Sequence, residues 1–369
     1  MASQGFFILR KYIFTPSLLV IFTQNFKMEL SEETLKRIQI LKDKYASIGQ
    51  NLDSYLDGLI FANPLTYWDY IEVDALLNLQ KPKTDFPDEK IFIVYHQITE
   101  LYFYLILHEI DQICHNGKNI SDIGQDLGWR EDLTVDFFIA RMKRINMYFD
   151  TLVKSFDVMR FGMEKDQFTK FRMSLLSASG FQTASYRKIE ITATDYIHLV
   201  HTSKREELKN SDFHTQLDNA YWRRGAIVED TGEKTLTLRD FEMKYLEEFH
   251  EFADEYQPIN LWRKFKMLPA KDQENKALIK ALRQFDINVN VNWPLVHFRT
   301  AAHYMGGPKG DEKGTGGTNW QKYLPPSFQK RIFYPELWSS SEKEEWGKKW
   351  VEEVLAEGLK TENKLRDSI

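Results

Sequence analysis

The sequence predicts an all-α fold, a single large helical bundle, from two long apolar stretches and from the amino-acid composition. Residues 88–115 are dense in Phe, Tyr, Leu and Ile on nearly every helical face, which is typical of a helix buried inside a bundle. Residues 133–160 form a second long helical pattern. Hydrophobic residues make up 43% and charged residues 28% of the chain, which suits a globular protein with a substantial core.

The N-terminal part of the chain predicts two further helices. Residues 30–50 follow a charged amphipathic pattern with two glutamates near its start, where acidic side chains stabilise a helix. A turn at Asn63-Pro64 precedes a second helix over residues 65–80.

Glycine and proline divide the C-terminal half. Residues 225–237 predict a loop or small hairpin that would act as a lid. Residues 282–305 predict a buried helix that Pro294 either begins or kinks. Residues 306–317 hold six glycines and one proline and predict a long flexible loop, and residues 341–360 predict an exposed charged helix.

Residues 1–27 stand apart from the rest. Their apolar run at residues 12–22 is shorter than a bilayer span and has no small-residue cleavage site, so it predicts neither a membrane helix nor a signal peptide. We interpret residues 1–27 as an N-terminal extension from a mis-assigned start, with Met28 as the initiator and residues 28–369 as a single domain. A helical arm or a weak targeting segment is the alternative.

Charge and cysteine content narrow the class of protein. The formal net charge is −5, from 49 basic and 54 acidic residues mixed along the chain, so no nucleic-acid surface is predicted. The single cysteine, Cys114, excludes intrachain disulfides and thiolate metal clusters and fits a reducing cytoplasm. Aromatic residues reach 14%, which fits a thick core between long helices or a pocket for a flat cofactor or substrate.

An arginine near the end of an apolar helical run is the first candidate for chemistry. Arg172 precedes a small-residue turn, where we expect Ser179 to cap the next helix and Gly180 to allow a tight turn. A guanidinium placed there can bind a carboxylate through two parallel hydrogen bonds. The alternative is an ordinary surface ion pair.

Two histidines each follow an aromatic residue by one helical turn. Phe92 and His96 share one face of the helix predicted over residues 88–115, so a planar substrate could stack there while its N–H bonds to the imidazole. His297 follows Trp293 by four residues, and a buried neutral imidazole on a helix is the usual proximal ligand of a heme. The alternative for each is a core histidine that bonds a backbone carbonyl.

Two shorter motifs are ambiguous by themselves. Gly314-Thr315-Gly316-Gly317 is a glycine-rich turn without the lysine and helix of a nucleotide-binding loop. Tyr67, Tyr70 and Ile71 lie close together on a predicted helix, a pattern that ordinary packing explains as well as a binding site does.

Together these motifs resemble the tryptophan 2,3-dioxygenase family, and they occur in the family's order. The resemblance extends from about Leu65 to Trp338. It implies an all-α heme enzyme that inserts both atoms of O2 across the indole C2–C3 bond of L-tryptophan. The product would be N-formyl-L-kynurenine, the first step of tryptophan degradation by the kynurenine pathway. The motifs that carry the resemblance are Leu65–Ile71, Phe92–Leu101, Phe171–Gln182, Trp293–Gly306 and Gly314–Gly317.

The resemblance implies a role for each site residue. His297 would be the proximal iron ligand of heme b, and His96 would be the catalytic residue that accepts the indole N–H. Arg172 would bind the substrate carboxylate and Thr315 its ammonium group. The other substrate-binding residues that it implies are Phe92, Phe168, Tyr67, Tyr70, Ile71 and Ser179.

The resemblance also implies an assembly. We expect a cytoplasmic homotetramer, a dimer of dimers, with exchanged N-terminal arms that place Tyr67 and Tyr70 at the active site of a neighbouring subunit. No nucleic-acid or membrane partner is expected.

Three features depart from the family pattern. His303 stands where the family usually has an arginine, Pro294 replaces a common basic residue, and residues 307–313 are longer than the usual connection. These departures put in doubt the contacts around the heme and the closure of the loop more than the assignment of His297 as the iron ligand. Residues 191–280 add no motif. The alternatives are a superfamily heme enzyme acting on another aromatic amino acid or indole derivative, and a non-catalytic heme-binding protein.

Overall fold

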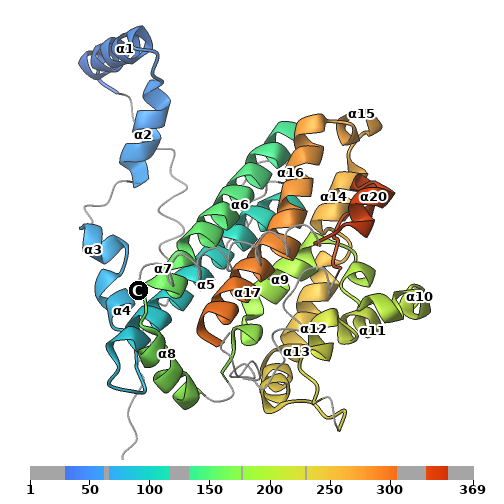
Figure 1. Cartoon of the computed structure of the whole chain (residues 1–369). Coiled ribbons are helices and arrows are strands. Elements are labelled where there is room, and N and C mark those ends of the chain that lie inside the picture. The colour runs from blue at the N-terminus through green and yellow to red at the C-terminus, as the bar shows by residue number, and fades with distance from the viewer. Residues whose placement is uncertain are drawn as a thin grey trace, which may run out of the picture. The chain divides into compact units, whose positions relative to one another are not determined.

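Backbone contacts divide the chain into two compact units, residues 1–78 and residues 79–369, and each unit is described by itself (Figure 1). The structure is a computed structural model, and it describes residues 30–61, 66–116, 133–175, 178–228, 231–305 and 330–347.

The first unit begins with two helices that pack on one another. α1 (Glu32–Ser47) agrees with the helix predicted over residues 30–50, and it has no buried residue. α2 (Leu52–Phe61) contacts α1 through the stacked rings of Tyr45 and Tyr55, whose centroids lie 4.3 Å apart. The sequence pattern did not predict α2.

The helix predicted over residues 65–80 is wrong as a single element. The structure has two short helices there, α3 (Tyr67–Tyr70) and α4 (Val73–Leu77). Glu72 between them has a φ of 49°, in the left-handed region that non-glycine residues avoid inside a helix. A single residue in this conformation ends α3 without interrupting the apolar pattern of the sequence.

The second unit is built around α5 (Pro87–Cys114), which confirms the helix predicted over residues 88–115. Pro87 lies in the first turn, where a missing N–H costs nothing. The helix is not buried on all sides, because Tyr104 is 70% exposed and Leu101 51% exposed. The other α-helices described in this unit are α6 (Val135–Ser155), α7 (Asp157–Phe161), α8 (Lys165–Phe171), α9 (Ala184–Ala193), α10 (Arg205–Leu208), α11 (Phe213–Asp218), α12 (Tyr221–Arg224), α13 (Leu236–Tyr256), α14 (Leu261–Met267), α15 (Ala270–Gln273), α16 (Lys276–Ile287), α17 (Trp293–Met305) and α20 (Ser340–Glu344).

Contacts among four helices organise the middle of this unit. α6 packs against α5 on one side and α16 on the other, and α9 also packs against α5 (Figure 1). The helix predicted over residues 133–160 is interrupted at Phe156, between α6 and α7. The stretch predicted over residues 282–305 runs from α16 through a π-helical turn (Asn288–Asn292) into α17. Pro294 is the second residue of α17, so it marks the beginning of that helix.

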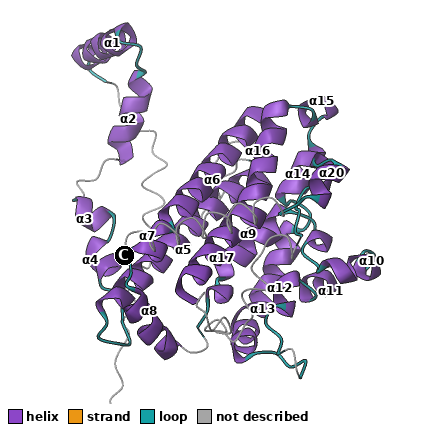
Figure 2. Ribbon diagram, in the orientation of Figure 1, coloured by secondary structure: helices purple, strands orange, loops and turns teal. Residues whose placement is uncertain are grey.

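The described residues contain helices and loops and no strand, which confirms the all-α class (Figure 2). An isolated backbone bridge pairs Ile227 with Lys234. Gly232 has a φ of 72° in the turn of this bridge, so the small hairpin predicted within residues 225–237 is present. The bridge closes only a few residues and adds no sheet.

The C-terminal prediction is only partly right. α20 ends at Glu344, and the indole of Trp346 is buried against Trp338, with ring centroids 4.9 Å apart. Residues 348–360 of the predicted helix lie outside the described residues.

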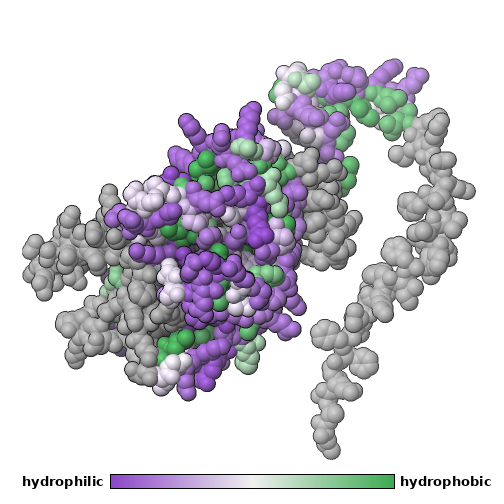
Figure 3. Space-filling view, turned by 90° about the vertical axis from the view of Figure 1, so that its right-hand side faces the viewer, coloured by the Kyte–Doolittle hydropathy of each residue, from purple (hydrophilic) through white to green (hydrophobic). Residues whose placement is uncertain are grey.

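One face of the larger unit can be seen in the space-filling view (Figure 3). On the face in view in Figure 3, hydrophobic residues form small separate spots among hydrophilic ones. No described helix is both long and apolar enough to cross a membrane.

Candidate active site

His96 lies in the middle of α5, and the helix itself determines its protonation. Its Nδ1 lies 2.7 Å from the carbonyl oxygen of Phe92, one turn earlier. A carbonyl oxygen only accepts hydrogen bonds, so Nδ1 carries the proton and Nε2 keeps its lone pair. The imidazole keeps some accessible surface, yet desolvation by the surrounding protein is the main cause that lowers the pKa of His96. His96 therefore presents a neutral acceptor.

Aromatic side chains from three helices pack on one another beside this histidine, and Phe92 is the member of the group that contacts it. The ring of Phe92 lies 4.1 Å from that of His96, 6.3 Å from that of Phe168 on α8 and 5.7 Å from that of Phe171. Tyr304 on α17 packs on Phe168 with ring centroids 4.3 Å apart. The structure thus brings together Phe92, His96 and Phe168, as the sequence predicts, into one apolar wall.

His297 on α17 has the same arrangement. Its Nδ1 donates to the carbonyl oxygen of Trp293 at 2.9 Å, which leaves Nε2 with its lone pair. The ring of Phe156 lies 4.6 Å away, edge-on. The pKa of His297 is lowered to about 4, mainly by desolvation and also by the charge of His96, against the raising effect of the hydrogen bond to Trp293. The two imidazoles are thus close enough to influence one another electrostatically.

Phe156 joins the surroundings of the two histidines. Its ring contacts His297 and also Tyr95, at a centroid distance of 5.6 Å, and Tyr95 lies 6.4 Å from the ring of His96. The sequence analysis missed Phe156 and Tyr95, because no motif marks them.

Arg172 follows α8 directly and is the first residue of a short 3-10 helix (Arg172–Leu175). The residue is 7% exposed, so it does not lie on the surface. Its chain neighbour Phe171 is fully buried and packs on Phe92, which places the arginine backbone beside the aromatic wall.

The turn after Arg172 confirms Ser179 as a helix cap and differs from the prediction in the role of Gly180. Ser179 caps a 3-10 helix (Gly180–Gln182) through a capping box with Gln182, while α9 begins only at Ala184, after Thr183. A Cβ on Gly180 would meet no atom within 4 Å, and its φ is not positive. Glycine is therefore not required for this turn.

Other predicted site residues belong to the N-terminal unit or lie outside the described residues. Tyr67, Tyr70 and Ile71 belong to the N-terminal unit, where their side chains are exposed. Thr315 and residues 307–313 lie outside the described residues.

The two departures on α17 occupy different environments. Pro294 is buried. His303 is exposed and its ring contacts Phe161 and Tyr304, with centroids 5.9 Å and 4.9 Å away.

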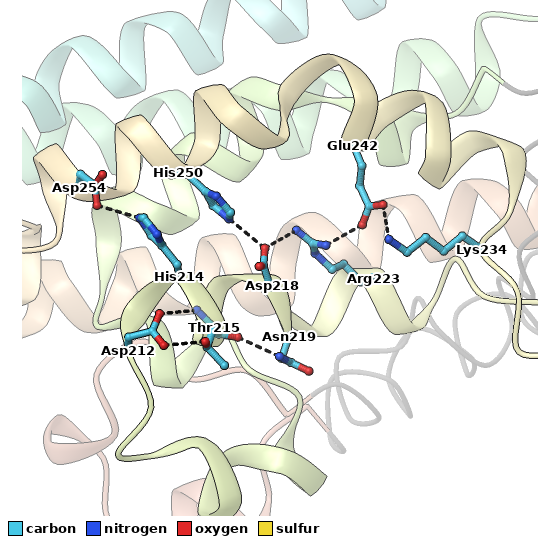
Figure 4. A network of polar contacts seen from close by, with 10 residues as sticks. All are labelled: Asp212, His214, Thr215, Asp218, Asn219, Arg223, Lys234, Glu242, His250 and Asp254. Atoms are coloured by element: carbon cyan, nitrogen blue, oxygen red, sulfur yellow. Dashed lines mark hydrogen bonds and ion pairs between the residues drawn. The ribbon is translucent and has the colours of Figure 1, made fainter.

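Histidines outside the motifs form surface contacts. His214 on α11 and His250 on α13 stack with ring centroids 4.6 Å apart, and they pair with Asp254 and Asp218, respectively (Figure 4). Arg223 extends this network from Asp218 toward the hairpin. No group of three or more possible metal ligands occurs among the described residues. The two ion pairs of the histidines join α11 to α13.

Comparison with known proteins places these features in a family. The family model described as tryptophan 2,3-dioxygenase matches residues 59–267, a stretch that includes His96 and Arg172. A tryptophan 2,3-dioxygenase of Bacillus thuringiensis subsp. konkukian is 30% identical over 297 residues, 76% of this chain and 92% of the relative.

Two other relatives carry the same name. That of Bradyrhizobium diazoefficiens is 28% identical over 284 residues, covering 75% of this chain and 92% of the relative. That of Herpetosiphon aurantiacus is 42% identical over 128 residues, 34% of this chain and 44% of the relative. From the family match and these similarities, the chain belongs to the tryptophan 2,3-dioxygenase family.

Proposed function

We propose that this chain cleaves the indole ring of L-tryptophan with O2 to give N-formyl-L-kynurenine, on a heme b held by His297. One observation carries the proposal for the site. His96 and His297 each donate Nδ1–H to a helix carbonyl, so each offers a neutral Nε2 within a desolvated aromatic environment.

The chemistry of His297 fits a heme. Iron binds the lone pair of a neutral imidazole, and a hydrogen bond from the other ring nitrogen increases the basicity of that ligand. The bond to Trp293 supplies this second interaction, and the low pKa keeps the imidazole deprotonated at neutral pH. When bound, the heme would supply the iron that activates O2.

The other site residues would bind and orient the substrate. Phe92 and Phe168 offer ring faces against which an indole can stack, and Nε2 of His96 accepts its N–H. Arg172, buried beside that wall, would bind the carboxylate, and Thr315 would contact the ammonium group. Holding the indole in reactive geometry can by itself contribute several kcal/mol to catalysis.

We also propose the assembly of the family, a cytoplasmic homotetramer (a dimer of dimers) with exchanged N-terminal arms. The N-terminal unit supports this proposal. Tyr67 is 73% exposed, Tyr70 75% and Leu59 70%, and an exposed apolar surface of this kind is typical of an interface. Tyr67, Tyr70 and Ile71 would then act in the active site of a neighbouring subunit.

Reconstitution with heme tests the ligand. We expect the reduced protein, kept free of oxygen, to have the spectrum of five-coordinate high-spin ferrous heme. His297→Ala should lose this spectrum, whereas His303→Ala, on the same helix, should keep it. A wild-type spectrum in His297→Ala would overturn the ligand assignment.

Turnover tests the reaction. Addition of L-tryptophan, ascorbate and O2 should produce the absorbance of N-formylkynurenine. Heme binding without that product would favour a non-catalytic heme-binding protein. Turnover of another aromatic amino acid or indole derivative, in place of L-tryptophan, would favour a superfamily enzyme with a different substrate.

A further inference from the structure

The helix that carries His297 begins after an unusual turn. In the π-helical turn Asn288–Asn292, the N–H of Trp293 donates to the carbonyl of Asn288, five residues earlier. In an α-helix the same N–H would bond the carbonyl of Val289. The π-helical turn therefore deprives the Val289 carbonyl of its usual partner.

Tyr186 on α9 replaces that partner. Its hydroxyl donates to the Val289 carbonyl at 2.7 Å, and the side chain is buried. A buried carbonyl without a donor is costly, so this bond stabilises the π-helical turn relative to a regular helix. The contact joins residues that are 103 positions apart in the chain.

Asp286, fully buried at the end of α16, also stabilises this turn through its hydrogen bonds. Its Oδ1 accepts from the side-chain nitrogen of Asn290 at 2.7 Å and from the N–H of Phe333 at 2.9 Å. Its Oδ2 accepts from the N–H of Tyr334 at 3.2 Å and from Nε1 of Trp338 at 3.0 Å. One carboxylate thus connects the turn to the segment after residue 330.

The turn matters because it decides which way α17 faces. A π-helical turn holds one residue more than an α-helical turn, so the helix after it is rotated by about 100° relative to an uninterrupted α-helix. Trp293 connects this turn to the site directly, since its N–H closes the turn and its carbonyl binds Nδ1 of His297.

We propose that Tyr186 and Asp286 are positioning residues for His297, because they hold the π-helical turn that sets the direction in which His297 Nε2 points. This inference rests on the proposed role of His297 as the heme ligand. Neither residue contacts the reacting atoms; both act through the backbone of residues 288–293.

A pair of tyrosine variants tests the proposal. Tyr186→Phe removes only the hydroxyl. Its matched control is Tyr196→Phe, because Tyr196 is equally buried and donates to a helix carbonyl, that of Ala253, at 2.9 Å. Asp286→Asn serves as a stronger perturbation of the same turn.

Two measurements distinguish a role in positioning His297 from a general loss of rigidity in the protein. In the cofactor-free protein, the amide hydrogens of residues 289–293 should exchange about tenfold faster in Tyr186→Phe, the effect expected for losing one hydrogen bond. In the heme-reconstituted ferrous protein, the iron–imidazole stretching band in the resonance Raman spectrum should shift in Tyr186→Phe and Asp286→Asn. Neither quantity should change in Tyr196→Phe.

The outcomes are distinct. A wild-type band and wild-type exchange in Tyr186→Phe, or equal changes in Tyr196→Phe, would overturn the positioning role while leaving the ligand assignment intact. An iron–imidazole band that persists in His297→Ala would overturn both the ligand and this inference.

Discussion

The site histidines and a surface histidine show how one residue type is adjusted in opposite directions. His96 and His297 bond a carbonyl of their own helix, and desolvation lowers the pKa of both. His115, at the end of α5, likewise bonds a helix carbonyl, that of Asp111 at 3.2 Å. It also bonds the carboxylate of Asp111 at 2.9 Å, and that bond raises the pKa of His115. Desolvation is therefore what makes the two site imidazoles neutral acceptors, even though the charge of Glu100 raises the pKa of His96.

The pH dependence of turnover follows from His96. Protonation of Nε2 would remove the acceptor for the indole N–H, and the pKa of His96 is lowered from its ordinary value. We therefore expect kcat/KM to be constant from pH 8 down to about 6.5, the ordinary histidine value, and to decline only below it. A pH profile with an acidic limb centred at or above that value would contradict this assignment. His96→Ser should lose the limb along with most of the activity.

Arg172 provides a test of substrate recognition. Arg172→Ala should weaken transition-state binding of L-tryptophan by about 2–4 kcal/mol, because the carboxylate loses its charged partner. Steady-state kinetics would measure this as kcat/KM. Turnover of tryptamine, which has no carboxylate, should change little, and so should the kinetics of Arg144→Ala, whose side chain is half exposed. Equal losses with both substrates would mean that Arg172 does not bind the carboxylate.

Single helices here carry buried and exposed ion pairs side by side. On α9, Glu190 is buried and accepts from Arg187 at 2.9 Å and from Arg331, which follows in the chain far beyond it. Two positions earlier on the same helix, Lys188 pairs with Glu248 of α13 at 2.5 Å near the surface. The buried cluster ties α9 to the segment at residue 331, and removing its carboxylate would leave two buried guanidinium groups.

This difference predicts unequal effects on stability. Glu190→Gln should lower the free energy of unfolding by about 3–5 kcal/mol, because it leaves buried positive charge without a counter-charge. Glu248→Gln should change it by about 0–1 kcal/mol, because water screens an exposed pair. Urea denaturation of the cofactor-free protein would measure both, and a small loss in Glu190→Gln would show that the cluster is not stabilised by that carboxylate.

At the scale of the whole molecule, the proposed arm exchange makes each active site depend on two subunits. Complementation of inactive variants tests this dependence. His297→Ala and the double variant Tyr67→Ala/Tyr70→Ala should each be inactive. Unfolding and refolding the two together should restore activity, because a mixed tetramer can join an intact His297 to intact tyrosines of a neighbour. Mixtures no more active than the separate variants would contradict arm exchange.

Long periodic stretches could be predicted from the sequence, and short interruptions could not. The bounds of α5 follow from its apolar run and from Pro87, which restricts where a helix can begin. By contrast, Glu72 divides α3 from α4 with one left-handed residue, and Phe156 divides α6 from α7. Neither break is marked by a glycine or a proline, the residues that most often end a helix, so the local sequence does not reveal them.

In the candidate site, too, some features could be predicted from the sequence and others could not. The sequence by itself determined the helical class, the residue types at Phe92, His96, Arg172 and His297, and the family they resemble, because spacing along a helix decides which side chains share a face. Only the tertiary structure decided that Arg172 is buried, that Phe156 and Tyr304 complete the aromatic surroundings, and that a π-helical turn precedes α17. The physical reason is that burial, desolvation and hydrogen bonds such as that of Tyr186 with Val289 arise between elements far apart in the chain.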